Sequence, residues 1–162
     1  MSALCSGGVR LRDQINAKWP NRDKASDGWI GDSAHSARTS DHNPDARGIV
    51  HAIDIDENLG VDYLRNGAQA RTLANELLLY ARSGLAGADR LKYVVYENRL
   101  ASGTYRSSWW KWRPGNWGHT AHIHVSFTSH ADKDDRPFPL PCLAPTKQQA
   151  SVWAKRLLDA TR

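Results

Sequence analysis

Residues 49–56 alternate between apolar and acidic or small side chains, which is the pattern of a half-buried β-strand. Successive side chains of a strand point to opposite faces, so Ile53 and Ile55 share one face and Asp54 and Asp56 share the other. The isoleucine face has the composition of a protein core. Burying an unpaired carboxylate costs much free energy, so carboxylates this close to a core indicate a compensating charge, and a bound cation is the simplest one.

A second alternating segment follows much later, at 119–127, and it carries histidines where the first segment carries aspartates. His122 and His124 share one face of this predicted strand, and Ile123 and Val125 share the other. Together with one histidine and one aspartate from the first region, these imidazoles form a set of nitrogen and oxygen ligands. Three protein ligands and one water are typical of catalytic zinc, so the sequence predicts a metal site between the two strands.

The remaining pattern predicts helices and a hairpin. Apolar residues at helical spacing predict three helices, at 9–19, at 61–82 and after a cap at Thr146. Gly67 is expected to interrupt the second helix. Residues 91–96 and 99–102 are expected to pair as a β-hairpin. The polar segment 21–39 is long for a loop inside a compact domain, which favours a functional role.

Length and composition are those of one domain. The chain has 162 residues, and we expect a core at about 9–130, followed by a proline-rich tail and a C-terminal helix at 131–162. No apolar run approaches the roughly 20 residues of a membrane span, so no stable membrane insertion is expected. Cys5 and Cys142 belong to no Cys-x-x-Cys pair and are expected to be free thiols, unless an oxidising compartment bridges them.

The formal net charge of +5 favours an anionic partner such as nucleic acid, a membrane surface or an acidic cell wall. Four tryptophans are interspersed with three basic residues: Trp109, Trp110, Trp112 and Trp117 with Arg106, Lys111 and Arg113. This cluster fits a flap packed beside the core, the wall of a substrate groove, or a surface on which nucleic-acid bases stack. A nucleic-acid binder would explain the charge and the tryptophans but not the ordered histidines and aspartates, so no nucleic-acid partner is expected.

Four short motifs occur in a characteristic order: Ser40-Asp41-His42, Gly48, Ala52-Ile53-Asp54 and His122-Ile123-His124. In this order they resemble the zinc D-Ala-D-Ala carboxypeptidase and L-Ala-D-Glu endopeptidase family, which includes phage endolysins and, more distantly, hedgehog-type domains. The likeness spans roughly 28–127, and it implies a single peptidase domain over 1–162. It implies an α+β fold in which a small antiparallel sheet carries a zinc site and helices pack on the other face.

The resemblance also implies roles for individual residues. It implies that Zn²⁺ is held by His42, Asp54 and His124. Asp56 is the rival of Asp54, because the two share a strand face, and the Ala-x-Asp match favours Asp54. Ser40 is expected to contact substrate or to position the ligand loop. Arg38 is expected to bind a substrate carboxylate or the oxyanion.

The general base is the point at which this chain departs from many members of the family. Those members carry Asp or Glu three positions before the last ligand, where this chain has Ala121. Others carry histidines two and five positions before it, and His122 and His119 match them. We therefore expect His122 to act as the base and His119 to assist it. Asp56 or Glu97 would be the alternatives as the general base.

The other histidines are expected to have no catalytic role: His35 is expected to be a loop residue, His51 a structural one and His130 a surface one.

The resemblance makes the peptide stem of bacterial peptidoglycan the expected partner. An L-Ala-D-Glu endopeptidase is favoured and a D-Ala-D-Ala carboxypeptidase comes next. The N-terminus lacks a signal-peptide pattern, which favours a phage endolysin that is made in the host cytoplasm and acts on the cell wall. A catalytically silent zinc-containing binding module is the alternative, and a basic nucleic-acid-binding protein is the third. The sequence does not indicate an oligomeric state.

Overall fold

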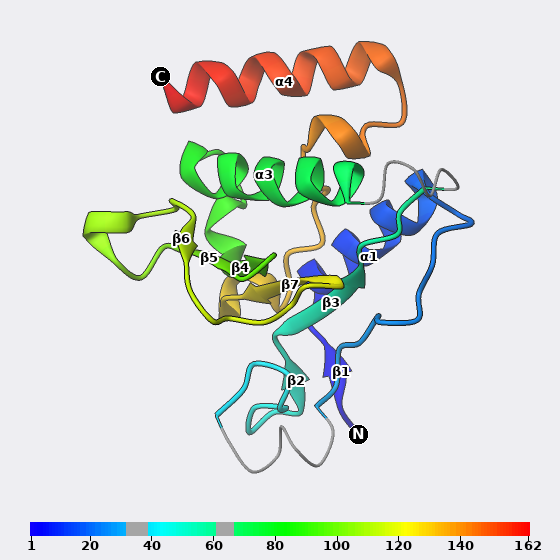
Figure 1. Ribbon diagram of the computed structural model, residues 1–162, viewed down its shortest axis with the longest axis vertical. Coiled ribbons are helices and arrows are strands. Elements are labelled where there is room, and N and C mark those ends of the chain that lie inside the picture. The colour runs from blue at the N-terminus through cyan, green and yellow to red at the C-terminus, as the bar shows by residue number, and fades with distance from the viewer. Residues whose placement is uncertain (32–38, 61–66) are drawn as a thin grey trace.

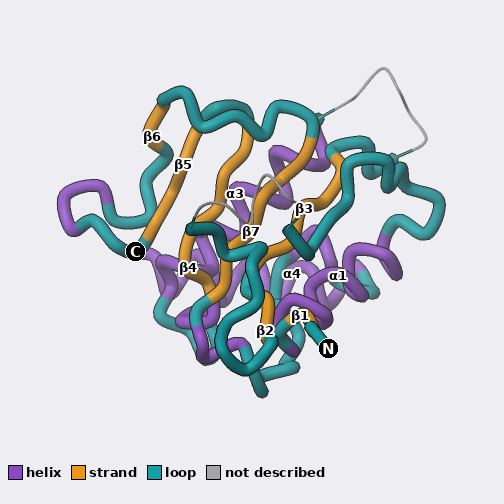
Figure 2. Tube along the Cα trace, turned by 90° about the horizontal axis from the view of Figure 1, so that it is seen from below, coloured by secondary structure: helices purple, strands orange, loops and turns teal. Residues whose placement is uncertain are grey.

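Five antiparallel strands form the central sheet of the computed structural model, which describes residues 1–31, 39–60 and 67–162. The strands are β3 (Ala52–Asp56), β4 (Leu91–Tyr96), β5 (Arg99–Ser102), β6 (Arg113–Pro114) and β7 (His122–Phe127). Their spatial order is β3-β7-β4-β5-β6, and Figure 2 shows them side by side. A separate parallel pair joins β1 (Ala3–Leu4) to β2 (Ile49–Val50). The α+β prediction is confirmed, but the expected small sheet is wrong in size, because β5 and β6 extend it.

The described residues contain three α-helices, α1 (Ser6–Lys18), α3 (Ala68–Ser83) and α4 (Lys147–Thr161). Short 3₁₀ turns lie at Ala88–Arg90, Arg106–Ser108, Ser129–Ala131 and Pro141–Leu143. In Figure 1, α3 lies across one face of the sheet and α4 lies on the outer side of α3. Within the described residues, no helix combines the length and apolar character needed to cross a membrane.

The helix ends follow the sequence signals. The Thr146 side chain caps α4 by accepting a hydrogen bond from the Gln149 backbone N–H, as expected. Gly67 adopts φ +80°, which favours glycine, and α3 begins directly after it. The start of α3 after Gly67 agrees with the expected interruption, and the part of the predicted helix at 61–66 lies outside the described residues.

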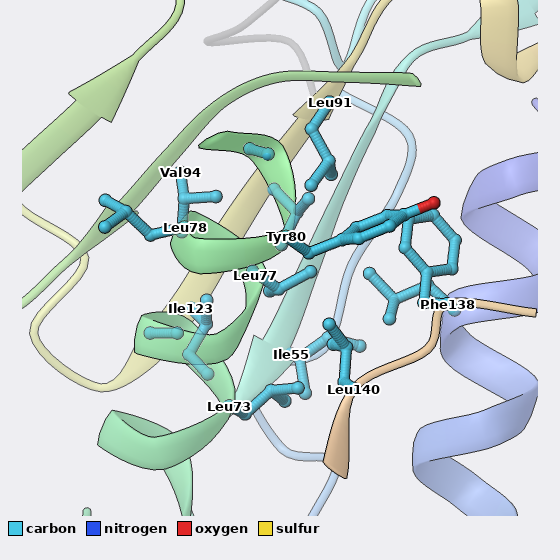
Figure 3. Close-up of a cluster of buried hydrophobic side chains, with 14 of the residues drawn as sticks. Ile55, Leu73, Leu77, Leu78, Tyr80, Leu91, Val94, Ile123, Phe138 and Leu140 are labelled. Atoms are coloured by element: carbon cyan, nitrogen blue, oxygen red, sulfur yellow. The ribbon is translucent and has the colours of Figure 1, made fainter. Parts of the chain in front are cut away.

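The core fills the space between the sheet and the helices. Leu73 and Leu77 of α3 pack with Ile55 and Ile123 of the sheet, as Figure 3 shows. Ala70 of α3 is buried in this core, whereas Ala68 at the start of the helix is exposed. The core also extends beyond the expected range at both ends of the chain, since it includes Leu4, Cys5, Phe138, Leu140, Leu143 and Leu157.

Arg90 is fully buried and joins the C-terminal tail to the rest of the fold. Its guanidinium donates to the backbone oxygens of Gly87, Asp134 and Arg136, and it lies 3.9 Å from the centre of the Phe138 ring. Replacing Arg90 with methionine leaves these oxygens without their charged donor. We expect a loss of about 3 kcal/mol in the free energy of unfolding. Urea denaturation measures it, and an unchanged midpoint would contradict the role given to Arg90.

Strand register divides the sheet into an apolar face and a polar face. Asp54 lies opposite His124, and Asp56 lies opposite His122, across the β3–β7 pair. Residues directly opposite each other in an antiparallel pair share a face, so these four side chains lie on the same face of the sheet. The isoleucines and valines between them belong to the face covered by α1 and α3. The fold thus places the candidate ligands on the side of the sheet away from α3.

Candidate metal centre

Three side chains that the resemblance pairs with zinc converge on one point of the polar face. His42 Nε2 lies 3.2 Å from His124 Nδ1 and 3.3 Å from Asp54 Oδ2. His124 Nδ1 lies 2.9 Å from Asp54 Oδ1. Both histidines are buried, and Asp54 is partly exposed. These three residues form a group that can hold a metal ion.

The spacing of the three ligand atoms fits a tetrahedral ion. Zinc binds nitrogen and oxygen at about 2.0–2.1 Å, which places tetrahedral ligand atoms about 3.3 Å from one another. The observed separations of 3.2, 3.3 and 2.9 Å lie close to that value. Two nitrogens and one carboxylate oxygen also suit a divalent transition metal better than Ca²⁺ or Mg²⁺, which prefer oxygen alone. The residues present therefore fit the metal that the motifs imply.

Hydrogen bonds on the far side of each imidazole fix its orientation. His42 Nδ1 lies 3.1 Å from the Trp29 carbonyl oxygen, which can only accept. His124 Nε2 lies 2.9 Å from the Ser126 hydroxyl. A proton on each of these outer nitrogens would let the nitrogens that face Asp54 bind a metal. This arrangement of outer partners is typical of histidines that bind metals.

The loop that carries His42 is held by backbone contacts. The His42 N–H donates to the Ser40 hydroxyl at 3.2 Å, and the Gly31 N–H donates to the His42 carbonyl at 2.9 Å. Gly28 exchanges two backbone hydrogen bonds with Asp54, so this segment lies along the free edge of β3. Ser40 thus positions the ligand loop, which is one of the two roles expected for it.

Charge and burial have opposite effects on the pKa values of Asp54 and the two histidines. Burial on its own would raise the pKa of Asp54, but hydrogen bonds from His124 and His42 hold that pKa well below its ordinary value. Burial lowers the pKa of His124. For His42 the penalty of burial is outweighed by Asp54, and the pKa is raised. The carboxylate is therefore ionised and His124 neutral at pH 7, which are the forms that bind metal.

His119 and His122 form a second group beside the first. His119 Nδ1 lies 2.6 Å from His122 Nε2, a hydrogen bond between the rings. Asp54 Oδ1 lies 3.7 Å from His122 Nε2 and 4.0 Å from His119 Nδ1, so the two groups share this carboxylate. Burial, followed by the nearby His124, lowers the pKa of His119 to about 4. The His119 ring is therefore neutral at pH 7 and can accept or pass on a proton.

The backbone at His119 is held in an unusual conformation by the β4–β5 hairpin. Gly118 and His119 have φ of +68° and +54°. Their carbonyls accept hydrogen bonds from the N–H groups of Asn98 and Glu97 in the predicted hairpin turn. Left-handed backbone is costly for a residue with a side chain, and such strain concentrates at functional sites. The hairpin thus fixes the direction in which the His119 ring projects.

The other candidates named from the sequence lie elsewhere. Asp56 accepts hydrogen bonds from Ser26 and Asn58, and the Glu97 carboxylate is bound by two arginines. His51 and His130 pair with other aspartates, Asp132 and Asp89. Arg38 and His35 lie outside the described residues. Of the acids considered, Asp54 is the one whose carboxylate lies within 4.0 Å of the histidines of the site.

The candidate metal centre opens onto a cavity of about 510 Å³. The cavity is lined by Thr39, Ser40, His42, Tyr93, Val95, Leu100, Trp117, His119 and His124. Tyr93 stacks on His124 with ring centres 5.3 Å apart, and neither this contact nor the one made by Ser126 was expected from the sequence. Strand alternation was the available signal for both, since Ser126 follows His124 by two positions and Tyr93 lies opposite Ser126. A larger cavity of about 610 Å³, near Trp109, lies away from both histidine groups.

Comparisons of this chain with family models, curated proteins and solved structures gave no match. What the centre does must therefore be inferred from its geometry and from its motifs.

Proposed function

We propose that this chain is a zinc-dependent peptidase that hydrolyses an amide bond in the peptide stem of bacterial peptidoglycan. The observation that carries the proposal is the close spacing of the His42, Asp54 and His124 ligand atoms, which suits a tetrahedral ion, at the wall of an open cavity. A structural zinc site is usually closed by four protein ligands, whereas three ligands leave one position for water or substrate. The cavity beside His42 and His124 provides space for a peptide.

Bound zinc would polarise the scissile carbonyl and lower the pKa of a coordinated water toward about 7. The chain itself supplies groups that handle the proton. His122 and His119 lie on the exposed side of Asp54, hydrogen-bonded to each other, and neither ring is fully buried. His122 accepts the proton of the attacking water as the general base. His119, hydrogen-bonded to His122, orients the His122 ring or shares the proton. The histidine pair thus takes the role that an acid at position 121 has in many members of the family.

The positive net charge supports an anionic wall as the target, because opposite charge accelerates encounter. An endolysin that acts on the cell wall after its host is breached fits this charge. An endopeptidase is favoured over a carboxypeptidase.

Digestion of purified peptidoglycan tests the proposal. We expect the zinc-loaded protein to release new peptide ends that mass spectrometry identifies, a chelator to abolish their release, and added Zn²⁺ to restore it. The variant His130→Ala is the control, because His130 is exposed and pairs with Asp89 away from the centre. If the zinc-loaded protein left the muropeptides unchanged in the absence of a chelator, the proposal would be contradicted. Zinc binding without any cleavage would instead support a binding module.

A further inference from the structure

One row of side chains crosses the whole sheet and starts at the metal centre. Asp54 lies opposite His124, His124 opposite Val95, Val95 opposite Leu100, and Leu100 opposite Arg113. Directly opposed residues share a face of the sheet, so Arg113 on β6 lies on the same face as the ligands. Val95 and Leu100 both line the cavity, and they form its apolar floor between His124 and Arg113.

Arg113 ends this row with part of its guanidinium unsatisfied. Its Nε and Nη2 are buried and have no hydrogen-bond partner among the described residues. The N–H groups on these two nitrogens point the same way and form the edge that binds a carboxylate through two parallel hydrogen bonds. Buried donors in native proteins are nearly always paired, so an open fork of this kind indicates a missing acceptor.

Two exposed aromatic rings flank the guanidinium. Its carbon lies 4.5 Å from the centre of the Tyr105 ring and 5.9 Å from that of Trp117. Tyr105 is 53% exposed and Trp117 is 42% exposed, so a shift of either ring breaks few contacts with the core. Trp117 also lines the cavity. A ligand in the cavity therefore reaches the guanidinium once a ring moves aside.

Three other cationic side chains form ion pairs with acidic side chains of the protein. Arg71 and Arg99 both bind Glu97, and Lys92 binds Asp41. Arg113 differs from these three because its fork faces no carboxylate within the described part of the chain. Arg113 is therefore a cation on the ligand face of the sheet that is available to a substrate carboxylate.

We propose that Arg113 binds the carboxy-terminal carboxylate of the stem peptide whose amide is cleaved at the metal centre. This inference deepens the proposed function and rests on it. The substrate it specifies is an acidic peptide that lies across β7, β4 and β5, with its cleaved amide at the metal and its free carboxylate at the guanidinium. Val95 and Leu100 pack beneath the residues between these two points.

The distance from the metal centre to Arg113 indicates which peptide bond is cleaved. Neighbouring strands lie about 4.8 Å apart, so the backbones of β7 and β6 are separated by about 14 Å. The arginine side chain shortens the remaining span, which leaves room for about three extended residues at 3.3–3.6 Å each. A carboxypeptidase would need its carboxylate contact within one residue of the cleaved amide. Arg113 therefore favours an endopeptidase that cuts the L-Ala–D-Glu bond of a tetrapeptide stem.

The test compares two ligands on the zinc-loaded protein. Both are stem tetrapeptides (L-Ala-D-Glu-L-Lys-D-Ala) in which a reduced bond replaces the L-Ala–D-Glu amide, and they differ only in ending as a carboxylate or a carboxamide. Calorimetry is expected to show that the wild type binds the carboxylate form about 10- to 100-fold more tightly. Arg113→Gln should bind both forms equally and weakly. Arg113→Lys should retain a small preference, because lysine keeps the charge but lacks the fork.

The matched control is Arg106→Gln, which removes the same charge from an exposed position of the same flap and should leave the preference intact. A wild type without preference, or an Arg113→Gln variant that keeps it, would overturn the inference. Loss of the preference with an unchanged melting temperature and zinc content would support it. Hydrolysis of the corresponding natural peptide is measured separately. Binding preference without hydrolysis would refute the proposed function alone, and hydrolysis without preference would refute this inference alone.

Discussion

Asparagine in place of Asp54 is expected to remove both zinc binding and hydrolysis. Among the described residues, Asp54 is the one whose carboxylate lies within 4.0 Å of both His42 and His124, and it also lies 3.7 Å from His122. Loss of an outer partner of a ligand typically weakens metal binding by about 10- to 100-fold, and loss of a ligand should cost more. We expect hydrolysis to fall on the order of a thousandfold. Zinc content after dialysis against a competing chelator, together with the rate of stem-peptide cleavage, measures both effects.

Asp56→Asn is the matched control, because Asp56 lies on the same strand face two residues away. Its carboxylate accepts hydrogen bonds from Ser26 and Asn58 and takes no part in the histidine groups. This variant should retain its zinc. If Asp54→Asn kept zinc as tightly as the wild type while Asp56→Asn lost it, the ligand assignment would be wrong.

Those parts of the site that depend on strand alternation could be predicted from the sequence. Asp54 and His124 each stand on a strand with a period of two, and that period is a local property of the chain. That the two strands are neighbours is not local, and only the order of the motifs indicated it. His42 lies in a loop without periodicity, so its place beside Asp54 followed from the resemblance alone.

The features that the sequence did not indicate depend on contacts between distant segments. β6 has two residues, too few for an alternation signal, so the extent of the sheet and the position of Arg113 required its pairing with β5. The burial of Arg90 depends on backbone oxygens more than forty positions later.

The tryptophans of the cluster differ in exposure in a way that composition cannot show. Trp110 is buried, whereas Trp109 and Trp117 are exposed.

The orientation of His119 gives a third case. The left-handed backbone at Gly118 and His119 accepts hydrogen bonds from the turn at Asn98 and Glu97, which precedes it by more than one intervening strand. The turn and the histidine could each be predicted from the sequence, but no local signal connects them. The hairpin and the catalytic candidate therefore form one unit, and a change in the turn should alter the position of the ring.

Alanine in place of His122 is expected to reduce kcat by about 10²- to 10⁴-fold, the usual contribution of a general base. Zinc content should stay unchanged, because His122 does not belong to the group of His42, Asp54 and His124. This combination separates a proton-transfer role from a ligand role. Cleavage of the natural stem peptide at saturating concentration gives kcat, and metal analysis of the same sample gives the zinc content.

His119→Ala distinguishes the two members of the pair. If His122 takes the proton and His119 orients it through the 2.6 Å contact, removing His119 should cost less than removing His122. Removing both should cost little more than removing His122 alone, because residues that act as a unit are not additive. Equal and fully additive losses would instead indicate independent roles. If kcat were unchanged in the double variant, the base would have to come from outside this pair, and the departure at Ala121 would favour a binding module over an enzyme.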